Sequence, residues 1–297
     1  MDKLVRVCDM IKEDETDTER SLSVKFVLCL MPRLYPLLLL VVFSFSQEVL
    51  ARHWVYLHSD APKPEKTALL ILNGFGGSRG GCKAQMEFWQ DSGMDVYIPD
   101  VLLRESLSAS SEALANFVEE HSLGEYGEIK AICYIAGAYL LHAQLQEISM
   151  PNLTAIVYDR SPTQERAPKA AMERIPKLSV LKLGRVLRDL SEAVWPPVPM
   201  GDSLKKGLVI ENRATRLMRF LRSEAEAMGP LVYEWRTIDS TAQDAFHVAL
   251  DHDMMYERWD VLGEPFLYFF EQGRFPEGLP RERIHNRPFD KKYPLPQ

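Results

Sequence analysis

The sequence predicts an α/β protein with a doubly wound, mostly parallel sheet. Short apolar runs, typical of strands buried on both faces, alternate along the chain with stretches of helical period. Strands separated by helices usually pair in parallel, with helices covering both faces of the sheet. The 297 residues suffice for one large domain of this kind.

The strands are expected where apolar runs end in turn residues. Ala68–Leu72 is followed by Asn-Gly, and Asp95–Ile98 by proline. The remaining strands are expected at Ile129–Tyr134, Leu153–Tyr158, Leu208–Ile210 and Leu231–Ile238. Helices are expected between them at Lys83–Gln90 and at Glu264–Gln272, which is followed by Gly273 as a stop signal. Three more helices are indicated by apolar residues at helical spacing: Leu114, Phe117 and Val118; Leu141, Leu145 and Ile148; and Leu217, Phe220 and Leu221.

The alternation of strands and helices organises residues 52–275 and is interrupted once. Residues 161–202 have a helical period that is broken by prolines, and they are rich in lysine and arginine. Their position predicts a short helical cap over the carboxyl ends of the strands. The basic charges indicate a solvated helical face, with an anionic ligand or a membrane surface as the alternative. Residues 276–297 are predicted to form an extended tail.

The first 51 residues are predicted to be a disordered extension followed by a signal-peptide-like segment. Met1–Lys25 is highly charged and lacks an apolar period. From Met31, a single Arg33 precedes the apolar run Leu34–Phe45 and then small residues, which is the layout of a secretory signal peptide. We therefore expect an exported protein, secreted or periplasmic, without membrane contact after signal removal. A membrane anchor is the alternative.

Composition places the chain among ordinary globular proteins, at 46% hydrophobic and 26% charged residues. The formal net charge of −7 argues against nucleic acid as a partner, because proteins that bind it usually carry a basic face. The four cysteines form no CxxC pair, and the histidines show no HExxH or comparable metal spacing. We therefore expect no metal and no cofactor, and the composition specifies no oligomeric state.

Two connections that follow predicted strands stand out. The loop from Asn73 to Ser78 is glycine-rich and follows the first strand, and the turn from Cys133 to Ala138 joins the third strand to a helix. In order and spacing these elements resemble the α/β-hydrolase fold of esterases, lipases and related acyltransferases. The resemblance covers about Trp54 to Phe275 and implies a site where the two turns meet.

The resemblance places a nucleophilic serine at Ile135, in the stretch Cys133-Tyr134-Ile135-Ala136-Gly137 that stands for the family's G-x-S-x-G. It also implies an oxyanion hole made by backbone N–H groups, with Ala136 as one donor and the Gly74-Phe75 loop as the other. Isoleucine has no hydroxyl, thiol or carboxylate, so it cannot attack a carbonyl. The nucleophile position is therefore degenerate.

The other positions of the implied catalytic triad are mixed. His252 best matches the family's histidine, with His247 as the competitor, and Thr215 stands where the resemblance implies the acid. Asp159, at the end of the preceding strand, is the alternative acid, although Asp-Arg-Ser-Pro is also a good turn sequence. Asp251 and Asp253 flank His252 and predict a raised pKa for its imidazole.

Three functions remain open from the sequence. The first is a hydrolase-fold protein without serine-triad catalysis that binds a small acyl or hydrophobic ligand, or a partner. The second is an active carboxylic-ester hydrolase with a displaced nucleophile, for which Ser78 and Ser161 are the nearest candidates. The third is a structural module without a pocket. Cys82 and Cys133, which remain after signal removal, are expected as two free thiols, with a disulfide as the alternative.

Overall fold

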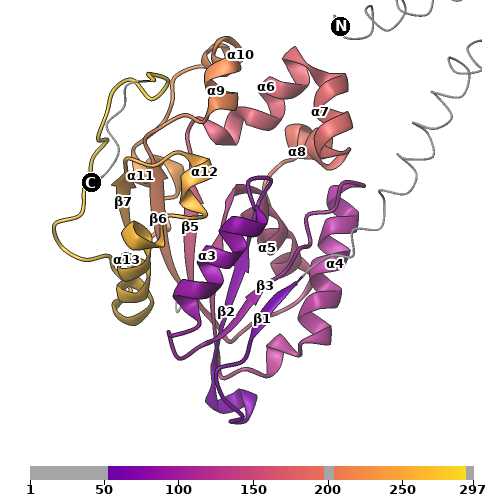
Figure 1. Ribbon diagram of the computed structural model, residues 1–297, viewed down its shortest axis with the longest axis vertical. Coiled ribbons are helices and arrows are strands. Elements are labelled where there is room, and N and C mark those ends of the chain that lie inside the picture. The colour runs from indigo at the N-terminus through magenta and orange to yellow at the C-terminus, as the bar shows by residue number, and fades with distance from the viewer. Residues whose placement is uncertain (1–52, 197–203, 292–297) are drawn as a thin grey trace, which may run out of the picture. The chain divides into compact units, whose positions relative to one another are not determined.

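The computed structural model describes residues 53–196 and 204–291, whose seven strands form one sheet in the order β1-β3-β2-β4-β5-β6-β7 (Figure 1). β1 pairs antiparallel with β3, and the other neighbours pair in parallel. The predicted doubly wound sheet is therefore confirmed. The expectations for residues 1–51 lie outside the described residues. The strands are β1 (Trp54–Tyr56), β2 (Thr67–Leu72), β3 (Asp95–Ile98), β4 (Glu128–Cys133), β5 (Leu153–Arg160), β6 (Lys205–Glu211) and β7 (Asp244–Val248).

Both faces of the sheet are covered, which is why most residues of its central strands are apolar and buried. Side chains alternate along β2, so Leu70 and Leu72 join one core cluster while Leu69 and Ile71 join the other. The first cluster packs under α4 (Leu107–Glu120) and α5 (Ile135–Glu147). The second packs under α3 (Arg79–Trp89) and α13 (Trp259–Gln272). Gly273 ends α13 in a left-handed conformation, as its position predicted.

The chain reverses its winding direction between β2 and β4. From β2 the sheet grows toward β3, and from β4 it grows the other way through β5, β6 and β7. In open α/β sheets, ligands bind at the carboxyl ends of the strands on either side of such a reversal. The loop after β2 and the turn after β4, which the sequence singled out, both lie at this point.

Several short helices cluster beyond the carboxyl ends of the strands (Figure 1). Three of them, α6 (Ala167–Arg174), α7 (Pro176–Leu183) and α8 (Val186–Glu192), follow β5 in the segment predicted as a cap. The others are α9 (Arg216–Phe220), α10 (Arg222–Ala227) and α12 (His252–Met255). α11 (Trp235–Ile238) leads instead to the amino end of β6, where Asp239 pairs with Lys206. Single 3₁₀ turns occur at Lys63–Glu65, Leu123–Glu125 and Gln164–Arg166. None of the described helices is both long and apolar enough to cross a membrane.

The predicted strand at Leu231–Ile238 is wrong. Residues 231–234 have no regular structure, Trp235–Ile238 forms the single turn α11, and the last strand is β7 at Asp244–Val248. The alternating apolar side chains that indicated a strand pack instead against the core clusters below the cap: Leu231, Tyr233, Trp235 and Ile238. The helix face expected after β6 is also wrong in part, because Leu217 and Phe220 are exposed while Met218 is buried.

The tail after α13 lies along the outer edge of β7. The N–H of His247 donates to the carbonyl oxygen of Pro280 at 2.8 Å. The side chain of Arg281 donates to the carbonyl oxygen of Ala245, while the N–H of Ala245 donates to its neighbour Asp244. These N–H and carbonyl groups of Ala245 and His247, which point away from β6, therefore have hydrogen-bond partners within the chain.

Candidate functional site

The turn between β4 and α5 has the close backbone approach that the resemblance implies. Tyr134 is extended at the start of the helix, Ile135 is its first residue, and the N–H of Tyr134 donates to the carbonyl oxygen of Leu72 at 3.0 Å. A Cβ atom placed on Gly137 would lie 2.0 Å from that same oxygen. Glycine is therefore required at position 137 by the packing of α5 against β2, whether or not a nucleophile is present.

A pocket of about 90 Å³ opens at this turn. Polar groups line it from the backbone at Gly74, Phe75 and Ala136 and from the side chains of Gln164, Glu165 and His252. Ile135 lines the pocket as well. The side walls come from the cap helices and α9, and they are mostly apolar: Ala167, Pro168, Ala171, Leu183, Leu187 and Leu217. The first turn of a helix leaves its N–H groups without intrahelical acceptors, and Ala136, the second residue of α5, lines the pocket.

The loop Asn73–Ser78 is fixed by hydrogen bonds between the side-chain amides of Asn73 and Gln85. The Asn73 side chain donates to Gln85 Oε1 at 3.1 Å, and Gln85 Nε2 donates back to Asn73 Oδ1 at 2.9 Å. Gln85 is fully buried on α3 and also donates to the Tyr134 hydroxyl at 3.2 Å. Asn73, which stands where the family has histidine, therefore holds the loop against α3 and β4.

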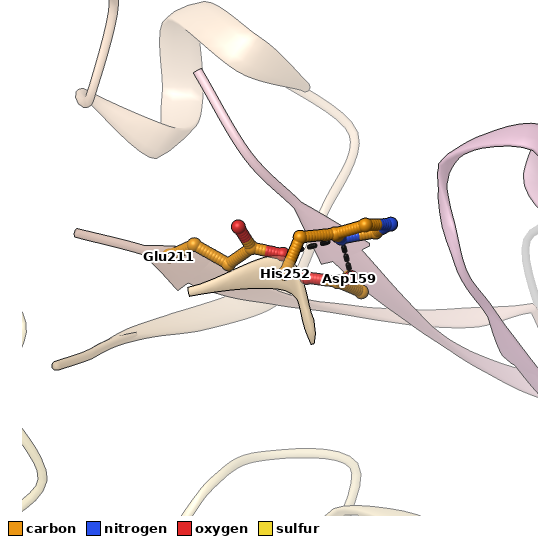
Figure 2. Close-up of side chains that lie close together, drawn as sticks. All are labelled: Asp159, Glu211 and His252. Carbon is orange, nitrogen blue, oxygen red and sulfur yellow. Dashed lines mark hydrogen bonds and ion pairs between the residues drawn. The ribbon is translucent and has the colours of Figure 1, made fainter. Parts of the chain in front are cut away.

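His252 is the first residue of α12, where Asp251 caps the helix by accepting from the N–H of Met254. Its Nδ1 atom lies 2.7 Å from Glu211 Oε1 and 3.0 Å from Asp159 Oδ2. Figure 2 shows the two carboxylates reaching the same side of the imidazole from the ends of neighbouring strands. Asp159 is in β5 and Glu211 is the last residue of β6, and all three side chains are almost fully buried.

The two carboxyl groups set the charge of this cluster. Burial lowers the pKa of His252, but Glu211 and Asp159 raise it by more, so that its pKa is well above the usual range. Burial and the neighbouring Asp159 also raise the pKa of Glu211 well above its usual range. The raised pKa values therefore favour the imidazolium form of His252 and the protonated form of Glu211. The predicted direction for His252 holds, but the cause is Glu211 and Asp159 rather than the flanking aspartates.

The second nitrogen of His252 is also occupied. Nε2 lies 3.2 Å from the hydroxyl of Tyr256, four residues further on, and this hydroxyl accepts a hydrogen bond from the N–H of Gly74 at 3.3 Å. Burial raises the pKa of Tyr256 well above its usual range, so the phenol keeps its proton. The imidazole is thus held at both nitrogens by groups of the protein.

The structure brings together part of the set that the sequence singled out. His252, Asp159, Ile135, Gly74, Phe75 and Ala136 all lie around the turn after β4 or its pocket. His247, the competitor, lies inside β7, where its Nδ1 accepts from the side chain of Asn212 at 2.9 Å and burial lowers its pKa to about 4. Thr215 is not an acid substitute, since its hydroxyl caps α9 by accepting from Met218.

The sequence interpretation missed Glu211 and Tyr256. The sequence predicts a strand that ends at Ile210, whereas β6 continues through Glu211, whose side chain contacts His252. Tyr256 carried a signal, because it follows His252 by four residues at helical spacing. Its hydrogen bond with the N–H of Gly74, 182 residues away in the chain, could not be predicted from any local sequence pattern.

The serines considered as displaced nucleophiles have other partners. Ser78 caps α3, with its hydroxyl accepting from the N–H of Gly81 at 2.9 Å. Ser161 is fully buried, and its hydroxyl accepts from the N–H of Gln164 at 3.1 Å and contacts that of Thr163. Cys82 and Cys133 are free thiols, in agreement with the expected state.

The Asp159–Glu211–His252 cluster also has the donor types of a metal site. One nitrogen and one oxygen from each carboxylate lie within 4.8 Å of one another, and Zn²⁺ accepts such ligands. However, the 2.7 Å between His252 Nδ1 and Glu211 Oε1 is the length of an N–H···O hydrogen bond. A nitrogen that ligates a metal has no proton for that bond. In the structure the cluster is therefore joined by a hydrogen bond that carries a proton.

Comparison with solved structures found similar chains at low identity. The mature lipase BlEst2 of Bacillus licheniformis is 14% identical with a TM-score of 0.54, covering 73% of this chain and 98% of its own. Est1E from Butyrivibrio proteoclasticus is 12% identical with a TM-score of 0.48, covering 75% and 94%. The enzyme MGS-MChE2, from a lagoon-sediment metagenome of Mar Chica, Morocco, is 15% identical with a TM-score of 0.44, covering 76% and 97%. No protein-family model and no curated protein matches the chain. At these identities the similarity shows the fold alone.

Proposed function

Since the chain has the α/β-hydrolase fold, we propose that it binds a small acyl or hydrophobic ligand and does not carry out serine-triad hydrolysis. The observation that supports this most directly is the place of Ile135. It is the first residue of α5, at the turn where the fold presents its nucleophile, and its side chain lines the pocket together with His252. An aliphatic side chain there offers a surface for contact and no atom for attack.

The pocket suits a short apolar group with one polar end. Its volume of about 90 Å³ is well below the roughly 300–1,000 Å³ of sites for drug-sized ligands. Its walls are mostly apolar, and Phe75 and Ala136, to whose N–H groups the resemblance gives the oxyanion hole, are among its lining residues. Such backbone donors can hold a carbonyl or carboxylate oxygen without any covalent step. The expected ligand is therefore a short-chain acyl compound bound by its oxygen.

Binding to the pocket is tested by titration calorimetry with butyrate and with ethyl butyrate. We expect saturable binding of at least one of them, and loss of binding in the Leu217→Trp variant, because Leu217 lines the pocket from α9. Leu181→Trp is the matched control. Leu181 is 70% exposed on α7 and does not line the pocket, so its variant should bind like the unmodified chain. Equal loss in both variants, or no binding of either compound, would count against the proposal.

Absence of hydrolysis is tested by a fluorophosphonate probe and by short p-nitrophenyl esters. The proposal expects no stoichiometric labelling of the unmodified protein and no turnover above a small residual rate. Stoichiometric labelling would instead support the alternative, an active ester hydrolase with a displaced nucleophile. Peptide mapping of the labelled residue would then identify that nucleophile directly.

A further inference from the structure

We propose that the hydroxyl of Tyr256 blocks His252 Nε2, and that it prevents hydrolysis independently of the loss of serine at position 135. In a serine triad the histidine nitrogen that faces the substrate binds the serine hydroxyl and takes its proton. Here a phenol hydroxyl from the neighbouring turn of α12 already binds that nitrogen. This inference rests on the proposed function, which excludes ordinary serine hydrolysis, and adds a second residue to its cause.

The Tyr256 hydroxyl is fixed in place from two directions. It lies 3.2 Å from His252 Nε2 and accepts a hydrogen bond from the N–H of Gly74, which belongs to the loop after β2. His252 is in turn fixed at Nδ1 by Glu211 at 2.7 Å. A continuous chain of hydrogen bonds therefore runs from the loop through the phenol and the imidazole to the carboxyl group.

The ring of Tyr256 has little freedom to swing away. It stacks on Tyr134 with ring centroids 4.1 Å apart and an interplanar angle of 12°. The backbone at Gly76 and Gly81 also packs closely against Tyr256. A Cβ atom placed on Gly76 would lie 2.5 Å from the Tyr256 ring, and one placed on Gly81 would lie 2.8 Å from the Cβ atom of Tyr256. Gly76 of the Asn73–Ser78 loop and Gly81 of α3 thus make room for this tyrosine.

The hydrogen bond forms in either charge state of the histidine. When His252 is neutral with its proton on Nδ1, Nε2 accepts the hydroxyl proton of Tyr256. When His252 is an imidazolium, Nε2–H donates to the hydroxyl oxygen, which has a second lone pair for the N–H of Gly74. A serine placed at position 135 would have to displace this partner before it could pass its proton to Nε2.

The test compares Ile135→Ser, Tyr256→Phe and the double variant. In the labelling reaction, serine Oγ forms a bond to phosphorus, fluoride leaves, and the hydroxyl proton passes to His252. We expect Tyr256→Phe alone to remain unlabelled and Ile135→Ser to react slowly. The double variant should react about tenfold faster than Ile135→Ser, because one buried hydrogen bond contributes roughly that factor to an equilibrium. The pH at which its labelling rate is half-maximal should also differ, since Nε2 has lost a partner.

Tyr134→Phe is the matched control, because Tyr134 stacks on the same ring while its hydroxyl donates to the carbonyl oxygen of Met255 at 3.0 Å. Adding it to Ile135→Ser should leave the labelling rate unchanged. Equal rates for Ile135→Ser and the Tyr256 double variant, or an equal gain from Tyr134→Phe, would overturn the inference. Labelling of the unmodified protein would instead overturn the proposed function, so the two failures are distinct.

A second measurement covers the case in which the double variant does not fold. In the single variant Tyr256→Phe, the ¹⁵N chemical shift of His252 Nε2 should change, because the nitrogen loses its phenol partner. The same resonance should stay in place in Tyr134→Phe. An unchanged Nε2 shift in folded Tyr256→Phe would overturn the inference, since it would mean that no hydrogen bond had been removed.

Discussion

Replacing Gly137 by alanine should strongly destabilise the protein, although it adds a single methyl group. The new Cβ atom would lie 2.0 Å from the carbonyl oxygen of Leu72 and 2.6 Å from its carbonyl carbon. Carbon and oxygen atoms in close contact are about 3.3 Å apart, so α5 and β2 would have to separate by about 1.3 Å. The carbonyl oxygen and carbon of Leu72 are backbone atoms of the central strand β2, which cannot move without disturbing the neighbouring strands.

The sign of the effect makes this change informative. In a helix interior, alanine is normally about 1 kcal/mol more favourable than glycine. We expect the steric cost to exceed this gain and to lower the free energy of unfolding by about 3 kcal/mol or more. With a urea m value of about 3 kcal/mol/M for a domain of this size, the unfolding midpoint should fall by about 1 M or more. Urea titration followed by circular dichroism measures the midpoint.

Gly124→Ala is the control for this prediction. Gly124 lies in the 3₁₀ turn Leu123–Glu125, and a Cβ atom placed on it would meet nothing within 4 Å. Its variant should unfold within about 0.5 kcal/mol of the unmodified protein. If Gly137→Ala were as stable as Gly124→Ala, the close approach of α5 to β2 would be refuted, and with it the sharp turn that carries Ile135.

Three further outcomes follow from the buried groups and the sequence. The free energy of unfolding should fall as the pH rises above about 4.5 for the Glu211 contribution and above about 6.5 for that of His252, because the raised pKa values of both groups give stability that is lost as they deprotonate; Glu211→Gln should flatten this slope in urea titrations at several pH values. Iodoacetamide should label the half-buried Cys82 before the fully buried Cys133, whose pKa is raised by burial; equal rates in peptide mapping would contradict the packing of β4. For export, N-terminal sequencing of protein from the culture medium or periplasm should begin after the apolar run Leu34–Phe45, whereas an intact N-terminus would contradict signal cleavage.

The sequence was most informative about the central strands. β2 and β3 end at Leu72 and Ile98, where the sequence predicts, because the asparagine and the proline that follow are strong local stop signals. The last strand was misplaced because β7 owes its structure to its neighbours. It has only five residues, and it pairs with β6 on one side and receives Pro280 of the tail on the other.

The candidate site could be located from the sequence but not completed. Ile135 and His252 were found because each follows a strand, so their place depends on local order. Glu211 and Tyr256 depend on distances between segments that are far apart in the chain. Both Asp159 and Glu211 reach His252 because of the stagger of β5 and β6, where Asp159 pairs with Val209, and no local pattern encodes that register.

The contacts between the tail and β7 have a consequence for the behaviour of a shortened chain. A protein cut after Gln272 would keep all seven described strands and the pocket. It would nevertheless present the N–H of His247 and the carbonyl oxygen of Ala245 to solvent on an open strand edge, since Pro280 and Arg281 satisfy them in the longer chain. Open edges pair with other chains. Such a fragment should therefore aggregate, and tags or fusions at the carboxyl terminus should leave the segment through Arg281 intact.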